Sequence, residues 1–250
     1  MNPSGPPKTL DLREQGATRD GQPQHSEGRL YVELLGLDCP RASGTLPIAD
    51  RLVAALGERG IGCVTYADLR RPLGLGLLVW TEDPEVLAGP LRECLADPGL
   101  PDELEVRPER SMLGRTYSSG FEPDLEDWLF ERPRRTLLSP SHVWAIWYPI
   151  RRRGSFGRLP TSDQAEILRE HGRIGRDYAD QDLAHDVRLA CHGLDANDND
   201  FVIGLVGKEL YPLSHAVQAM RQTRQTAEFI ESMGPFFVGR VLECHADRRR

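Results

Sequence analysis

The chain has no long apolar run and no excess of positive charge. None of its hydrophobic stretches approaches the roughly 18 residues that a membrane span needs, and the first 29 residues contain no apolar signal core, so neither a membrane span nor secretion is predicted. The formal net charge of -7 and the pI near 5.6 argue against a nucleic acid or an anionic membrane as the main partner, because both need a basic surface. We therefore expect a cytoplasmic protein.

The cysteines form neither a disulfide framework nor a zinc site. They are five in number, an odd count, and are widely spread with no CxxC pair, so reduced thiols are expected. A hydrophobic content of 39% in 250 residues is sufficient for a sizeable core. The cysteines are Cys39, Cys63, Cys94, Cys191 and Cys244.

Composition divides the chain into four segments. Residues 1–28 are rich in proline, glycine, glutamine and charge, which predicts a disordered tail. Residues 29–116 and 142–246 each show the element order βαββαβ, and residues 117–141 form a polar, proline-bearing connector with a short helix near 125–130. The two halves are therefore predicted to be duplicates of one ferredoxin-like unit.

Apolar runs predict the strands and a spacing of 3.6 residues predicts the helices. In the first half we expect strands at 30–37, 61–67, 74–81 and 103–110 and helices at 47–59 and 83–96. In the second half we expect strands at 142–150, 187–193, 201–207 and 235–242 and helices at 162–175 and 210–229. The predicted class is α+β, with the two ferredoxin-like repeats closing into a dimeric α+β barrel within one chain and leaving a cavity between sheet and helices.

A histidine on the apolar face of the helix 162–175 is the first candidate site residue. His171 shares that face with Ile167 and Ile174. Such a histidine is either a hydrogen-bonded core residue or a metal ligand. Gly172 and Gly175 directly after it would allow a flat macrocycle to approach closely, or they mark the end of the helix.

Tyr148 lies 23 residues before His171, in the strand 142–150. Alternation places it on one face with His142, Trp144 and Ile146, so its hydroxyl needs a partner, which is either a backbone carbonyl or a ligand.

Arginines cluster near these two residues in the sequence. Arg152 belongs to the run 151–153, whose other two members are expected to be solvated. Arg221 lies at the edge of the apolar stripe that the helix 210–229 turns toward the core. An arginine in this position needs a negatively charged partner, which is either a ligand carboxylate or an acidic residue of this or another subunit. Imidazole ligates iron, guanidinium groups pair with carboxylates, and a tyrosine can donate a hydrogen atom to an oxidised iron centre. The set predicts a haem or iron-porphyrin protein.

Five short motifs occur in the second half of the chain: Tyr-Pro-x-Arg-Arg from 148, Glu-His-Gly-x-Ile-Gly-Arg-x-Tyr from 170, Gly-Leu-Asp from 193, Met-Arg from 220 and Gly-Pro-Phe-Phe-Val-Gly from 234. With these motifs and the duplicated βαββαβ pattern, the chain from about residue 30 to 241 resembles the chlorite dismutase-like superfamily. Within it, the chain is most similar to the coproheme decarboxylases.

The resemblance assigns roles by position. His171 matches the proximal iron ligand, and Tyr148 matches the tyrosine that becomes a radical during oxidative decarboxylation. Arg134 and Arg221 match propionate-binding arginines. Two further residues depart from the family pattern in a conservative way: Arg152 stands where a lysine is frequent, which keeps the charge but not the geometry, and Thr226 stands where a serine helps to hold a propionate.

Two questions about the site stay open in the sequence. The distal residue is either Asp186 or Arg188, since alternation places both on one face of their strand. A distal guanidinium would favour peroxidase or chlorite chemistry, because it stabilises an anionic oxygen ligand. No residue in the sequence identifies the carboxylate expected to orient His171 through its second nitrogen.

The resemblance implies an oxidoreductase that converts iron-coproporphyrin III to haem b with hydrogen peroxide, a step of haem biosynthesis. It also implies a homo-oligomer, as relatives usually form pentamers. One alternative is a haem b-dependent chlorite dismutase or peroxidase. A second is a non-catalytic haem carrier or sensor, because fold and ligand do not fix function.

Overall fold

The computed structural model describes residues 9–248, and both of its halves contain the predicted order βαββαβ, with one additional short strand in the second half. The first half contains β3 (Tyr31–Asp38), α1 (Leu46–Glu58), β4 (Gly62–Asp68), β5 (Gly74–Thr81), α2 (Glu85–Ala88), α3 (Pro90–Leu95) and β6 (Glu105–Arg115). The second half contains β7 (Trp144–Arg152), η2 (Phe156–Arg158), α5 (Thr161–Asp180), β8 (His185–Ala190), β9 (Phe201–Gly207), α6 (Leu210–Met220), α7 (Arg224–Phe229), β10 (Ile230–Met233) and β11 (Phe237–His245).

The strands close into a barrel, which confirms the predicted fold class. The 9-stranded sheet has the order β10-β7-β11-β4-β5-β3-β6-β8-β9, and an additional pairing of β7 with β9 closes it, with β10 attached to the end of β7. The two halves meet at two seams, where β11 pairs with β4 and β6 pairs with β8. Closure leaves few free sheet edges and gives each half an inner and an outer face.

Large apolar side chains from both halves fill the barrel interior. Trp80 from the first half and Trp147 from the second are both buried there. Gly204 on β9 makes room for the second of these rings, since a Cβ at this position would lie 2.5 Å from Trp147. The interior is therefore a packed core, and any ligand site must lie on an outer face.

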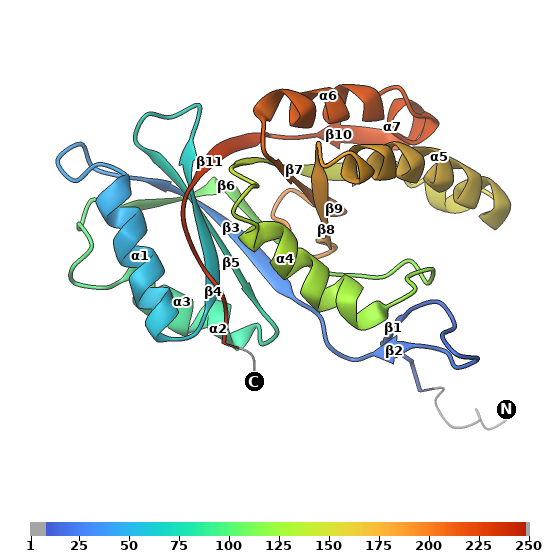
Figure 1. Cartoon of the computed structure of the whole chain (residues 1–250), viewed down its shortest axis with the longest axis horizontal. Coiled ribbons are helices and arrows are strands. Elements are labelled where there is room, and N and C mark those ends of the chain that lie inside the picture. The colour runs from blue at the N-terminus through green and yellow to red at the C-terminus, as the bar shows by residue number, and fades with distance from the viewer. Residues whose placement is uncertain (1–8, 249–250) are drawn as a thin grey trace, which may run out of the picture.

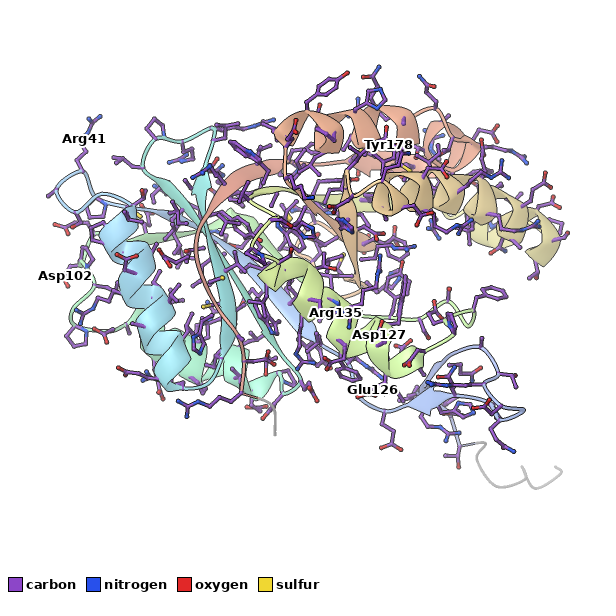
Figure 2. The ribbon with its side chains drawn as sticks, in the orientation of Figure 1. Arg41, Asp102, Glu126, Asp127, Arg135 and Tyr178 are labelled. Atoms are coloured by element: carbon purple, nitrogen blue, oxygen red, sulfur yellow. The ribbon has the colours of Figure 1, made fainter. Side chains whose placement is uncertain are left out.

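Helices cover the outer faces of the two halves (Figure 1). Helices α1 and α3 pack on the first half, and α5 and α6 pack on the second. Tyr178, labelled in Figure 2, comes from α5 and hydrogen bonds through its hydroxyl to His215 of α6, so these two helices lie side by side. Among the described residues no helix has both the length and the apolarity required to cross a bilayer.

Three predicted helices have different boundaries in the structure. The helix expected at 83–96 divides at Gly89, where Pro90 begins a new helix because it lacks the N–H that would continue the first. The helix expected at 210–229 divides before Thr223, whose side chain caps α7. Helix α5 runs on to Asp180, so the reading of Gly175 as a helix end is wrong.

The connector 117–141 is more structured than a polar linker. It contains the π-helical segment η1 (Asp127–Glu131) followed by α4 (Arg132–Leu138). Leu129 and Phe130 are buried in the barrel cluster. Charged residues occupy the outer side, where Arg135 pairs with Asp127 at 2.6 Å (Figure 2). This segment therefore contributes to the core of the molecule.

The disordered tail predicted for 1–28 is wrong from residue 9 onward, and residues 1–8 lie outside the described part of the chain. The Glu14 carboxylate accepts from Arg115 Nη1 at 3.0 Å, and Gln24 donates to the carbonyl of Ala17 at 2.7 Å. The segment is held by polar contacts and not by a periodic apolar pattern, so composition did not indicate that it is ordered. The short strands in this segment are β1 (Glu14–Gln15) and β2 (His25–Ser26).

Candidate functional site

His171 lies midway along α5 with its ring half-buried against the start of α7. Its Nδ1 is 3.2 Å from the hydroxyl oxygen of Thr223. That hydroxyl donates its own proton to the carbonyl of Met220 at 2.8 Å, so it accepts the Nδ1 proton of His171. The lone pair of the imidazole is therefore on Nε2, the nitrogen available to a metal.

The electrostatic surroundings keep His171 neutral. Burial lowers the pKa of His171 to about 4, and the positive charges of Arg188 and Arg152 contribute to this lowering, against the smaller effect of Asp186. A neutral imidazole is the form that ligates iron. The expected orienting carboxylate is replaced here by the Thr223 hydroxyl, which sequence reasoning missed.

Arg152 comes from the end of β7 and lies between two aromatic rings. Its guanidinium carbon is 4.5 Å from the ring centroid of Phe156 and 4.7 Å from that of Phe201. Its Nε is buried and has no hydrogen-bond partner within residues 9–248, and burial lowers the pKa of the group. A buried guanidinium without a directly bonded carboxylate is costly unless an anion pairs with it. This geometry fits a ligand carboxylate.

The two candidate distal residues form one charged cluster with the connector. Asp186 Oδ2 lies 2.6 Å from Nε of Arg188, and Asp186 Oδ1 accepts from Nη2 of Arg132 at 2.5 Å. Both guanidinium groups lie over the ring of Trp128, at 4.5 Å for Arg132 and 5.0 Å for Arg188. Burial alone would raise the pKa of Asp186, but the two arginines outweigh it and the pKa is lowered. The predicted shared face of Asp186 and Arg188 is thus present, and the guanidinium is the more exposed of the two groups.

Tyr148 is buried on the outer face of β7, at 4% exposure, in the cluster that α6 covers. Its ring stacks on Phe236 with centroids 4.6 Å apart, and its hydroxyl makes no hydrogen bond to any described residue. Burial and the negative charge of Asp186 raise the pKa of Tyr148, whereas the charge of Arg221 lowers it. The phenol is therefore protonated and lies within the electrostatic reach of the charged cluster.

Thr226 and Arg221, the next two residues predicted to hold a propionate, belong to the surroundings of His171 and Tyr148. Thr226 Oγ1 is 3.3 Å from the hydroxyl of Thr223, one contact away from His171. Arg221 is exposed at the end of α6 and its charge reaches Tyr148.

Arg134 has other partners. Its Nε donates to Asp247 at 2.9 Å and its Nη2 donates to Glu82 at 2.8 Å, at the end of β5. The side chain is 7% exposed, so these two carboxylates balance the charge that the resemblance assigned to a propionate. We do not include Arg134 in the site.

Sequence reasoning also missed residues of the connector. Tyr117 is partly buried. Burial raises the pKa of Tyr117, and the positive charges of Arg188 and Arg152 oppose this effect, so its phenol belongs to the same surface as these arginines. Trp128 supports the charged cluster from η1. Both residues lie outside the strands of the site, so the periodicity of the sequence does not indicate that they approach it. Only the fold brings them there.

Comparisons with known proteins identify the family and the fold of the chain. The family model described as Chlorite dismutase matches residues 106–242, which is more than half of the chain. The structure of a haem-binding protein from Thermus thermophilus matches with a TM-score of 0.69 and 22% identity, covering 86% of this chain and 92% of that one. A variant of chlorite dismutase from Candidatus Nitrospira defluvii, in complex with cyanide, matches with a TM-score of 0.66 and 16% identity over 86% and 92%. No protein of curated function matches. The structural matches confirm the predicted fold.

Proposed function

Because the chain belongs to the chlorite dismutase family, we propose that it binds a haem-type iron porphyrin and is an oxidoreductase. The reaction we propose is the oxidative decarboxylation of iron-coproporphyrin III to haem b with hydrogen peroxide. The observation that carries the proposal is the arrangement of a neutral, oriented imidazole and a buried phenol around a surface that contains Arg152, Arg188 and Arg221.

His171 is the proposed iron ligand. Its Nδ1 proton is bound by Thr223, which fixes the tautomer and directs the lone pair of Nε2 away from α7. The low pKa keeps that lone pair available through the neutral range. Haem or coproheme bound here would supply the iron redox chemistry, with peroxide as the oxidant.

The propionate carboxylates of the porphyrin are the proposed partners of Arg152, Arg221 and Thr226. Arg152 has a buried Nε that lacks a partner among residues 9–248, and Arg221 makes no ion pair within the same part of the chain. A carboxylate would compensate the buried cation and accept several hydrogen bonds at once. Pairing at these positions would hold the macrocycle in place and would bring a propionate toward Tyr148.

Tyr148 is the proposed catalytic residue. Its phenol would lose a hydrogen atom and then take one from the β-carbon of a propionate. Loss of a second electron and of carbon dioxide from that side chain leaves a vinyl group. For each propionic acid group, one hydrogen peroxide is consumed and one carbon dioxide and two waters are formed, so atoms and electrons balance. The buried, protonated state of Tyr148 suits hydrogen-atom transfer, because no proton has to be acquired from solvent.

The test is a comparison of Tyr148→Phe with Tyr178→Phe, both loaded with iron-coproporphyrin III and titrated with hydrogen peroxide. The second variant removes a phenol that lies on α5 and is bonded to His215. Mass spectrometry of the porphyrin should show vinyl products with the wild type and Tyr178→Phe and none with Tyr148→Phe, while all three bind the porphyrin. Undiminished vinyl formation by Tyr148→Phe would remove this residue from the mechanism.

A haem b-dependent chlorite dismutase or peroxidase is the second candidate, and Arg188 favours it. Its guanidinium is on the same surface as His171 and lowers the pKa of that imidazole, so it could stabilise an anionic oxygen species. Oxygen evolution from chlorite by the haem b-loaded protein, lost in Arg188→Gln, would support this reaction. A protein that holds haem and reacts with neither oxidant would instead be a carrier.

A further inference from the structure

A second cluster of potential metal ligands lies at one end of the barrel, formed by His142, Asp182 and His185. His142 precedes β7, Asp182 lies in the turn after α5, and His185 begins β8. Since β7 and β8 both pair with β9, the beginnings of these two strands come together there. None of the three is part of the proposed porphyrin site.

The ligand atoms have nearly the separation that one metal ion requires. His185 Nε2 lies 2.8 Å from Asp182 Oδ1, and His142 Nε2 lies 4.0 Å from the same oxygen. All three ligand atoms are within 4.8 Å of one another, and this is the one such group in the described part of the chain. Tetrahedral zinc with bonds of about 2.0–2.1 Å spaces its ligand atoms roughly 3.3 Å apart. Small side-chain movements would therefore complete the site.

The hydrogen bonding of His142 leaves an unfavourable contact that a cation would relieve. Its Nδ1 is 2.8 Å from the carbonyl oxygen of Thr136, which can only accept, so Nδ1 carries the proton. The side chain is 9% exposed, and the neutral ring then presents the Nε2 lone pair toward the carboxylate of Asp182. Two acceptors facing each other, one on a nearly buried ring and one on a half-exposed carboxylate, repel, and a metal ion between them would be bound by both.

Lys208 completes the surroundings of the carboxylate. Its ammonium contacts Asp182 Oδ2, the oxygen not shared with the two histidines. The Oδ1 atom therefore stays directed toward the rings of His142 and His185, which stack with centroids 4.5 Å apart. The positive charge of Lys208 weakens cation binding but does not occupy the place between the ligands.

We propose that His142, Asp182 and His185 bind a divalent transition-metal ion of the zinc type, with water as a fourth ligand. Two imidazoles and one carboxylate form a donor set that zinc commonly takes. The ion would join three chain segments at the start of β8, the strand that carries Asp186 and Arg188. This site is independent of porphyrin binding.

The experiment uses the full-length chain without a histidine tag, freed of metal by a chelator, both with and without bound haem. Zinc binding is measured by equilibrium dialysis, and cobalt(II) substitution gives a visible absorption that reports the ligand geometry. One equivalent is expected in both forms, with an affinity at least about tenfold weaker in Asp182→Asn and His185→Gln. Both side chains are partly exposed, so these variants should fold.

Two further variants separate the proposal from general histidine binding. Lys208→Gln removes the neighbouring positive charge and should bind zinc more tightly than the wild type. His192→Ala removes a histidine that pairs with Asp200 outside the cluster and should leave zinc binding unchanged. The proposal fails if the wild type takes up no stoichiometric zinc, or if His185→Gln binds it as tightly as the wild type.

Discussion

The hydroxyl of Thr223 lies 3.2 Å from Nδ1 of His171 and also caps helix α7. One side chain therefore orients the proposed iron ligand and begins the helix that carries Thr226. Thr223→Val should lose both functions: about 1 kcal/mol of stability from the cap and about tenfold or more in iron-porphyrin affinity from the orienting bond. Absorbance titration with haem and thermal unfolding measure the two effects.

Thr223→Ser is the matched control for that substitution. It keeps the hydroxyl, so both properties should stay close to those of the wild type. If Thr223→Val binds haem as tightly as Thr223→Ser, the hydroxyl does not orient His171.

Arg152 and Arg151 are adjacent but have opposite environments. Arg152 has a buried Nε without a partner in the described part of the chain, whereas Arg151 pairs with Asp198 at the surface. Arg152→Met should weaken binding of a porphyrin with free propionates by about 2 kcal/mol, roughly thirtyfold, because a charged hydrogen bond is lost. Arg151→Met should have little effect. A porphyrin whose carboxylates are esterified should bind Arg152→Met and the wild type with the same affinity. If the variant also loses about thirtyfold in affinity for the ester, Arg152 does not recognise a carboxylate.

The low pKa of His171 predicts an acid sensitivity of the porphyrin-free protein. The pKa is about 4 in the folded chain and near 6.5 for an ordinary histidine. Between these values the unfolded chain binds more protons than the folded one, so the free energy of unfolding should fall as the pH falls from about 6.5 toward 4. His171→Gln should show a smaller fall over this window in thermal unfolding. Identical pH dependence in the two proteins would mean that His171 titrates normally.

The sequence placed His171 and Tyr148 in the helix and the strand where the structure has them, but it missed several groups around them. His171 and Tyr148 lie in regular elements, where periodicity assigns a face and where the family motifs are short and local. Thr223 was missed because a helix cap interrupts an apolar pattern that otherwise continues through residues 210–229. Trp128 and Arg132 were missed because their partners are far away in sequence, and no period links them to β8.

Arg134 shows the converse case. Its position matched a propionate-binding arginine, but the C-terminal segment brings Asp247 to it, and Glu82 adds a second carboxylate. Both partners are remote in sequence from residue 134, so the competition between an internal acid and a ligand could only be decided by the fold. The eight predicted strands, by contrast, all overlap strands of the structure, because each has an apolar pattern, whereas the short strands β1, β2 and β10 were not predicted.

Substitution of Arg134 should therefore lower the stability of the protein without changing its affinity for haem. Arg134→Met leaves the nearly buried Asp247 carboxylate without its ion-pair partner and should destabilise the chain by about 3 kcal/mol, with haem affinity unchanged once the protein is folded. The neighbouring Arg135→Met removes an exposed pair with Asp127 and should cost less than about 1 kcal/mol. Chemical denaturation and haem titration of the two variants test this. A selective loss of haem affinity in Arg134→Met would return this residue to the porphyrin site.

The coordination of iron by the imidazole of His171 is the central claim, and a His171→Gly variant tests it most directly. The absorption spectrum of the full-length variant is recorded with iron porphyrin, before and after addition of free imidazole. We predict that the wild-type spectrum is lost in the variant and returns when imidazole enters the space left by the side chain. A variant that takes up the porphyrin with the wild-type spectrum in the absence of imidazole would contradict the account.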